Sequence, residues 1–284
     1  MPQKVLEDKL RRFLVEDLGQ GDITTVLIVP EDSRAEAEMI TKENGVIAGM
    51  EEARIMVEGL ELEIDVKVSD GENIDAKSVL ARISGNTRTI LSVERTLLNL
   101  VSRMSGIATM TRQLTEKLRK AGYETKIAST RKVAPGLLYF DKKAVMIGGG
   151  DTHRLHLDDM ILIKDNHIAV AGSVKEAIER VKEKVSFSKK IEVEVTSVEK
   201  ALTAAKAGAD IIMLDNFTPQ QIEDAVRSLK NEQKYEQVLI EVSGGITPTN
   251  ILRCASKGID IISLGRLTKS PEALDLSLEV TRIQ

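Results

Sequence analysis

The pattern of apolar and polar positions divides the chain into two parts. Residues 1–18 have a helical pattern, and short strand-like runs between Ser33 and Ile90 are interrupted by glycines, which indicates a small β-rich module. From Ser92 onward apolar residues recur three and four positions apart, and this spacing predicts a long helix with one buried stripe. The stripe consists of Leu97, Val101, Met104 and Ala108.

The opposite stripe of this predicted helix carries polar and small residues. Its members are Arg95, Asn99, Ser102 and Gly106. Such a face is typical of solvated surface, but it can also line a cleft or a subunit contact into which Arg95 would extend. The pattern alone leaves both interpretations open.

The second half of the chain repeats a strand followed by a helix. Six apolar runs predict strands, at residues 126–130, 160–163, 191–195, 211–214, 238–242 and 261–264. N-cap signals mark four helices, namely Ser173 with Glu176, Thr196 with Glu199, Thr218 with Gln221 and Pro219, and Thr247 with Pro248. This alternation predicts a parallel sheet covered by helices.

Charged residues or glycines stand at the carboxyl end of every predicted strand. They are Thr130-Arg131-Lys132, Lys164-Asp165-Asn166-His167, Glu194, Asp215-Asn216, Ser243-Gly244-Gly245 and Gly265-Arg266. In a parallel α/β barrel these ends converge on one face, whereas in an open doubly wound sheet they spread along an edge. Because charge at so many strand ends is hard to explain by stability, we favour the barrel.

The candidate face must accommodate both signs of charge. Its cations are Arg131, Lys132, Arg154 and Lys164, and its acids are Glu194 and Asp215. Unpaired buried cations are costly, so this density of basic groups favours an anionic ligand over a purely structural network of ion pairs.

The turn Ser243-Gly244-Gly245 is a candidate phosphate site. It ends a strand and runs toward the helix predicted near Thr247, where glycines allow close approach and free N–H groups would point at an anion. Such turns also occur in ordinary loops, but Gly265 ends the next strand, so two glycine loops could share one phosphate.

The histidines do not predict a zinc site. His153 and His156 lack a third defined ligand, and on a strand they would point to opposite faces. His153 beside Arg154 is better interpreted as anion binding, and His156 as structural.

Composition excludes several classes of protein. Forty basic and 44 acidic side chains give a net charge of −4, and there are no tryptophans, three tyrosines and four phenylalanines, so nucleic acid is not expected as a partner. The single cysteine, Cys254, cannot form an internal disulfide and is interpreted as an apolar filler. No apolar run reaches the roughly 18 residues of a membrane helix, and we expect a cytoplasmic protein.

The string STRKVAPGLLYFDKKAV, followed by GGGDTHRLHLDDMILIKDNHI within residues 129–168, closely resembles the quinolinate phosphoribosyltransferases, also called carboxylating nicotinate-nucleotide pyrophosphorylases. The resemblance continues through EDLGQGDITT, SVERTLLNLVSRMSGIAT, EVEV, MLDN, SGGI and SLGRLTKS. It implies an N-terminal open-faced α/β sandwich (1–108), an incomplete, TIM-like parallel α/β barrel (109–267), and a segment 268–284 that returns to the sandwich.

The resemblance also implies a reaction. The family transfers phosphoribosyl from phosphoribosyl pyrophosphate to quinolinate and releases pyrophosphate and carbon dioxide, giving nicotinate mononucleotide for NAD synthesis. By similarity, quinolinate would bind Arg131, Lys132, His153, Arg154 and Lys164, with Arg95 contributed by the partner subunit of a homodimer. The donor's 5-phosphate would bind Ser243, Gly244, Gly245 and Gly265, and its ribose hydroxyls Glu194 and Asp215.

The same resemblance implies catalytic roles for Lys132, Lys164, Glu194 and Asp215. Mg²⁺ would bind through the donor's pyrophosphate, without a dedicated set of protein ligands. The sequence departs from the family pattern at Val133-Ala134, Leu138 and Lys269.

Three alternatives stay open at this point. Lys164 at a barrel strand end could form a Schiff base in an aldolase-like lyase. The chain could also be a non-catalytic phosphosugar-binding protein or belong to a related family linked to molybdenum transport. The intact LIKDNH at 162–167 favours the quinolinate enzyme over the last of these.

Overall fold

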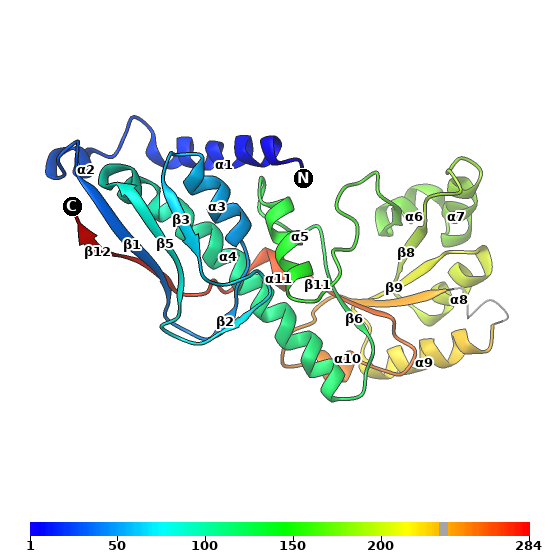
Figure 1. Cartoon of the computed structure of the whole chain (residues 1–284). Helices are drawn as coiled ribbons and strands as arrows, with labels where there is room; N and C mark the ends of the chain where they lie inside the picture. The colour runs from blue at the N-terminus through cyan, green and yellow to red at the C-terminus, as the bar shows by residue number, and fades with distance from the viewer. Residues whose placement is uncertain (233–237) are drawn as a thin grey trace. The chain divides into compact units, whose positions relative to one another are not determined.

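The computed structural model describes residues 1–232 and 238–284 (Figure 1). The chain forms two compact units, one of Met1–Met110 with Pro271–Gln284 and one of Thr111–Ser270. None of the helices in the described ranges is long and apolar enough to cross a membrane.

The first unit contains a four-stranded antiparallel sheet in the order β12-β1-β5-β3. Its strands are β1 (Arg34–Thr41), β3 (Glu63–Val66), β5 (Val79–Asn86) and β12 (Leu276–Ile283), and β2 (Gly45–Val46) pairs separately with β4 (Asn73–Ile74). The helices α1 (Gln3–Leu18), α2 (Ile23–Ile28) and α3 (Met50–Glu58) belong to the same unit. Alternate residues of β1, including Ala37 and Met39, are fully buried, as expected for a sheet with one covered face.

The long helix α4 spans Thr87–Lys120 and so begins five residues before the predicted start at Ser92. The predicted apolar stripe is confirmed, because all four of its side chains are fully buried. The polar stripe is divided. Arg95 and Asn99 are exposed, but a Cβ at Gly106 would lie 1.9 Å from the carbonyl oxygen of Glu272, so this glycine allows the returning C-terminal segment to pack closely.

The second unit contains a six-stranded parallel sheet in the order β6-β11-β10-β9-β8-β7. The strands are β6 (Lys126–Ser129), β7 (Ile161–Ile163), β8 (Ile191–Val195), β9 (Ile211–Asp215), β10 (Leu239–Ser243) and β11 (Ile261–Leu264). All six predicted strands are confirmed. The last strand pairs with the first, and the order has none of the reversal that defines a doubly wound sheet. No ladder joins β6 to β7 within the described residues, so the barrel is incomplete.

The helices of this unit are α5 (Leu138–Ile147), α6 (Asp165–Ala171), α7 (Val174–Lys182), α8 (Val198–Ala207), α9 (Pro219–Lys230), α10 (Ile251–Cys254) and α11 (Arg266–Lys269). Two predicted caps are confirmed. The Ser173 hydroxyl accepts from the backbone N–H of Glu176, and Thr218 and Gln221 form a reciprocal capping box with Pro219 in the first turn. Cys254 is buried, as predicted.

Two predicted caps are wrong. Ser197, one residue beyond Thr196, caps α8 and accepts from the backbone N–H of Lys200 at 3.2 Å. Thr247 caps only a turn, since its hydroxyl accepts from Asn250 N, and α10 begins later, at Ile251. In both places adjacent hydroxyl or amide residues compete for the same role, and local sequence does not decide between them.

Candidate active site

A cavity of about 420 Å³ opens at the carboxyl ends of the parallel strands. Ten of the twelve predicted site residues line it: Arg131, Lys132, His153, Arg154, Lys164, Glu194, Asp215, Ser243, Gly244 and Gly245. Gly265 adjoins the cavity, because a Cβ placed on it would lie 3.1 Å from Cδ of Lys132. Arg95 belongs to the other unit, where its side chain is two-thirds exposed and 3.8 Å from Glu94.

Two arginines bring positive charge to one side of this cavity. Arg131 follows β6, and Arg154 follows the segment whose residue Asp151 forms a bridge to β6. Burial lowers the pKa of Arg154, and the nearby charge of Arg131 lowers it further. Like charges held this close are stabilised by an anion between them.

Carboxylates occupy the ends of β8 and β9. Glu194 accepts a hydrogen bond from Lys164 Nζ at 2.9 Å, so one ion pair of the structural kind does exist here. Burial raises the pKa of Asp215, and the neighbouring charge of Glu194 adds to this rise. Asn216 Nδ2 donates to Asp215 at 2.7 Å and opposes the shift.

The turn after β10 interlocks with the turn after β9. Gly244 has φ +87°, and a Cβ on it would lie 2.4 Å from Oδ1 of Asn216. Asn216 also adopts a left-handed conformation, with φ 57°, and its N–H donates to the carbonyl of Ser243 at 2.9 Å. Because α10 starts at Ile251, the expected helix N-terminus does not follow this turn directly, and only loop N–H groups are near a ligand there.

His153 lines the cavity and lies next to two buried carboxylates, which the sequence analysis did not predict as site residues. Its Nε2 lies 3.1 Å from Glu241 and 3.2 Å from Glu192, and both carboxylates are fully buried. Glu192 belongs to β8 and Glu241 to β10, and alternate strands of an α/β barrel fill the same interior layer. The available signal was a glutamate flanked on both sides by apolar residues within each strand.

The protonation of this cluster follows from its burial. Burial alone would lower the pKa of His153, but the hydrogen bonds and charges of Glu192 and Glu241 outweigh it and raise the pKa to about 10. Burial likewise raises the pKa of Glu192. His153 Nδ1 lies 2.8 Å from the backbone nitrogen of Arg154, whose N–H it can accept when the ring is neutral. Both ring nitrogens therefore face protein groups, which differs from the expectation that this imidazole binds an anionic ligand.

Among the residues that the structure describes, two groups have ligand atoms close enough to share a cation. One is the buried cluster of His153, Glu192 and Glu241, and the other is the exposed group of His156, Asp158 and Asp159. In the first the imidazole can itself supply positive charge, and in the second Asp159 already accepts the backbone N–H groups of Leu155 and His156. We therefore assign a metal to neither group.

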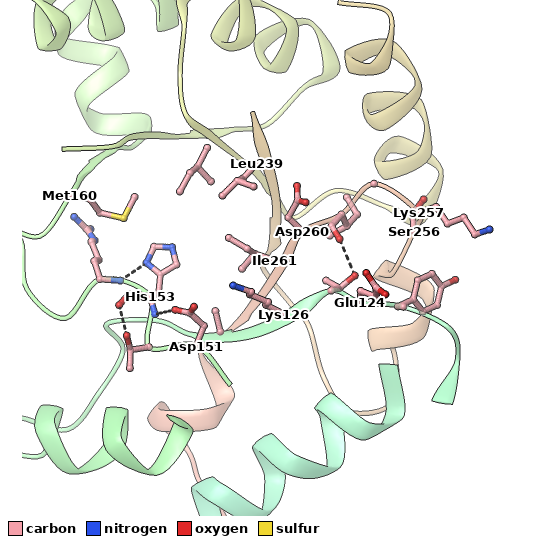
Figure 2. Close-up of a pocket in the computed structure, with 18 of the residues that line it drawn as sticks. Glu124, Lys126, Asp151, His153, Met160, Leu239, Ser256, Lys257, Asp260 and Ile261 are labelled. Atoms are coloured by element: carbon pink, nitrogen blue, oxygen red, sulfur yellow. Dashed lines mark hydrogen bonds between the residues drawn. The ribbon is translucent and has the colours of Figure 1, made fainter. Parts of the chain in front are cut away.

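A larger cavity, of about 880 Å³, lies at the opposite, amino ends of the strands (Figure 2). It is lined by Lys126, Leu239 and Ile261 from the starts of their strands, and it approaches His153 from the other side. One of its carboxylates, Asp260, already accepts a hydrogen bond from the N–H of Ile240 at 2.8 Å. Since active sites of α/β barrels lie at the carboxyl ends, the smaller cavity is the candidate active site.

Comparison with known proteins agrees with this geometry. Family models of quinolinate phosphoribosyl transferase match the chain over residues 22–105 for the N-terminal domain and 107–279 for the C-terminal domain. The chain belongs to this family. The predicted fold class is confirmed, because a solved structure of a relative shares the fold over almost the whole length of the chain.

The relatives are similar over nearly their entire chains. The "probable nicotinate-nucleotide pyrophosphorylase [carboxylating]" of Methanothermobacter thermautotrophicus is 44% identical over 273 residues, covering 96% of this chain and 98% of that one. The protein of the same description from Methanocaldococcus jannaschii is 45% identical over 277 residues, with 97% of each covered. The solved nicotinate-nucleotide pyrophosphorylase from Francisella tularensis has 38% identity and a TM-score of 0.90, covering 99% and 98% of the two chains.

The buried cluster predicts a pH-dependent stability. Replacing His153 with Gln leaves two buried carboxylates without positive charge, and we expect a loss of roughly 3–5 kcal/mol at neutral pH. Burial already raises the pKa of Glu192 above its ordinary value of 4.5, and in the variant this group also loses the opposing charge of His153. The deficit should therefore be small below about pH 4, where the carboxyl groups are protonated in both states, and should grow as pH rises through the folded-state values.

Thermal unfolding from pH 4 to 8 measures this deficit. His156→Gln is the matched control, because His156 is exposed, and it should unfold like the unmodified protein at each pH. A deficit that is the same at pH 4 and pH 8 would show that the imidazole does not balance the carboxylates.

Proposed function

We propose that this protein transfers phosphoribosyl from phosphoribosyl pyrophosphate to quinolinate with decarboxylation, forming nicotinate mononucleotide, carbon dioxide and pyrophosphate in NAD synthesis. One observation carries the proposal. In a chain of this family, one cavity at the strand ends joins two arginines, two lysines, three carboxylates and a glycine turn. Two polyanionic reactants need cations, and the ribosyl centre between them needs negative charge.

Quinolinate carries two adjacent carboxylates on a planar ring. Arg131 and Arg154 suit such a dianion because each guanidinium can donate two parallel hydrogen bonds. Lys132, on the same loop as Arg131, adds a further cation, and Lys164 stands at the end of β7. His153 lies beside this site, with its Nδ1 2.8 Å from the backbone nitrogen of Arg154.

Phosphoribosyl pyrophosphate would lie along the ends of β8 to β11. The backbone of Ser243, Gly244 and Gly245 can approach its 5-phosphate closely, with Gly265 beside them. The carboxylates of Glu194 and Asp215 can accept hydrogen bonds from the ribose hydroxyls. These placements follow the family resemblance and the positions of the residues around the cavity.

The chemistry requires little covalent participation by the protein. As the bond from C1 to pyrophosphate breaks, C1 gains positive charge, which Glu194 and Asp215 stabilise while the quinolinate nitrogen attacks. Lys164 holds Glu194 in place through their ion pair. Carbon dioxide then leaves with the positively charged pyridinium nitrogen stabilising the electron pair, and C2 takes up a proton. Orientation of the two reactants supplies a large part of the rate.

We also propose Mg²⁺ as the cofactor. The oxygen donors of Glu194 and Asp215 in the cavity suit a hydrated Mg²⁺, and the ion would be carried mainly by the pyrophosphate oxygens. When bound, it neutralises the charge of the leaving pyrophosphate. Lys132 and Lys164, which also line the cavity, would add to this neutralisation of charge.

A homodimer completes the proposal. Arg95 is exposed, next to Glu94 on α4, and we assign it to the quinolinate site of a partner subunit. This assignment gives a role to the exposed part of the polar stripe.

The alternatives are not favoured. A Schiff base requires a neutral amine, whereas the Lys164 ammonium is paired with Glu194 at 2.9 Å. The curated relatives are named as nicotinate-nucleotide pyrophosphorylases, which speaks against both the molybdenum-associated and the non-catalytic interpretations.

Release of pyrophosphate tests the function directly. With Mg²⁺ and phosphoribosyl pyrophosphate present, quinolinate should cause release of pyrophosphate, carbon dioxide and nicotinate mononucleotide, and nicotinate should cause much less. Saturable binding of phosphoribosyl pyrophosphate without quinolinate-dependent release would contradict the proposal. Borohydride trapping at Lys164 with a carbonyl substrate would support the lyase instead.

Arg131→Lys tests the quinolinate site. The charge is kept but the planar pair of donors is lost, so KM for quinolinate should rise about tenfold or more, while KM for phosphoribosyl pyrophosphate changes little. Steady-state kinetics with each substrate varied in turn gives both values. Unchanged quinolinate affinity would remove Arg131 from the site.

Glu194→Gln tests stabilisation of the developing charge. The amide keeps the shape but loses the negative charge, so kcat should fall roughly 100-fold, with a smaller effect on binding of the donor. If the variant changes only KM for phosphoribosyl pyrophosphate, Glu194 anchors the ribose and does not stabilise the reacting carbon.

Mixed dimers test Arg95. Arg95→Ala alone should have little activity, and a second variant, Glu194→Gln, that keeps Arg95 should have the roughly 100-fold lower kcat expected above. Mixing the two should restore activity to sites that combine the intact Glu194 of one chain with the intact Arg95 of the other. Absence of rescue in verified heterodimers would show that Arg95 does not serve the site of the other subunit.

A further inference from the structure

A lysine lies buried behind the arginine side of the cavity. Lys142 belongs to α5 and is only 1% exposed. Its Nζ donates to the carbonyl oxygens of Thr152 and, at 3.4 Å, of Ser129. Lysine is almost never fully buried without specific partners, so these two carbonyls account for its position. It does not line the cavity and has no place in the mechanism described above.

The two carbonyls belong to the segments that carry the arginines. Ser129 ends β6 two residues before Arg131, and Thr152 lies two residues before Arg154. The hydroxyl of Ser129 also donates to the carbonyl of Thr152 at 3.3 Å, so both segments meet at one point. The ammonium of Lys142 therefore ties together the two pieces of backbone whose spacing sets the distance between the guanidinium groups.

Four charged groups act on this ammonium. Asp151 and, from α5 itself, Asp141 stabilise its charged form, whereas Arg131 and Arg154 oppose it. Burial is the largest influence, and together these effects lower the pKa of Lys142 to about 8. The charge of this lysine thus changes within the range where enzymes work, and both opposing cations belong to the proposed quinolinate site.

We propose that Lys142 is a positioning residue for the dicarboxylate, whose ammonium holds the Arg131 and Arg154 segments at the spacing that a pair of adjacent carboxylates requires. This inference rests on the proposed function. A bound dianion screens the repulsion between the arginines and Lys142, so it stabilises the ammonium. By linkage the ammonium in turn favours binding of the dianion.

The coupling has a specific signature. Between pH 7 and 9 the free protein loses the Lys142 proton, and binding of the dicarboxylate should restore part of it. Affinity for the dicarboxylate should fall as pH rises through about 8, whereas affinity for phosphoribosyl pyrophosphate, which contacts the ends of β8 to β11, should change less. His153, with a pKa of about 10, titrates above this window.

Calorimetric titration of the intact protein measures this signature without catalysis. The probes are quinolinate and benzene-1,2-dicarboxylate, which has the same two carboxylates and no ring nitrogen. At pH 8, titrations in buffers of different ionisation enthalpy should show net proton uptake with either probe. In Lys142→Met the uptake should disappear, the dissociation constant at pH 7 should rise about tenfold, and its dependence on pH between 7 and 9 should flatten.

Lys182→Met is the matched control. Lys182 also donates to a backbone carbonyl, that of Ala207 at 3.0 Å, but it lies at the exposed end of α7. This variant should keep both the affinity and the proton uptake. If Lys142→Met fails to fold, the unmodified protein still decides, because absence of proton uptake at pH 8 on binding of either dicarboxylate overturns the proposal.

The two proposals fail in different ways. If neither dicarboxylate binds the unmodified protein at any pH, the proposed function itself is wrong. If both bind without proton uptake, or if Lys142→Met binds them as tightly as the unmodified protein with the same pH dependence, the function stands and the role of Lys142 is wrong. A weaker affinity in Lys142→Met that keeps the original pH dependence would indicate only structural damage and would also overturn the coupling.

Discussion

Charged side chains buried inside the barrel must be balanced by groups of opposite charge. This requirement determines which residues lie together around the cavity. Interior positions of α/β barrels are ordinarily filled by branched apolar side chains. Here β8 and β10 each contribute a fully buried carboxylate, and the imidazole of His153 lies between them. The charge of Glu192 also stabilises the charged form of Arg154, which lines the cavity next to His153. Buried acids therefore compensate part of the positive charge of the site within the chain itself.

The remaining parts of the site are held by backbone geometry. The loops after β9 and β10 fix each other through Asn216, Ser243 and Gly244, and the segments after β6 and before Arg154 meet at Lys142. Side chains that face the ligand are consequently anchored by residues that do not. This arrangement suits a reaction whose rate depends on holding two anionic molecules in a fixed relative orientation.

Much of the fold could be predicted from local pattern. The six parallel strands, the apolar stripe of α4 and the caps at Ser173 and Thr218 depend on period and on hydroxyl chemistry, both visible in the sequence. The errors arose where neighbouring residues competed, as at Thr196 beside Ser197. The start of α10 was misplaced because a capped turn at Thr247 has the same local signal as a capped helix.

The site could be predicted where charge or glycine stood at a strand end and where His153 and Arg154 stood side by side. Glu192, Glu241 and Lys142 were not predicted. The sequence does not show whether a charged residue within an apolar element points inward, or which groups it contacts there. The motif resemblance supplied candidate roles. Only the three-dimensional arrangement revealed that both nitrogens of His153 already have partners within the chain.

The interlocked turns after β9 and β10 also limit how this part of the protein can change. Any side chain larger than hydrogen at position 244 would collide with the amide of Asn216, and that asparagine keeps its unusual backbone through a bond to the neighbouring residue, Ser243. Neither turn can be remodelled alone. A change in preference for the sugar phosphate would thus require paired substitutions in both loops. The sequence of these two turns should therefore change slowly in evolution.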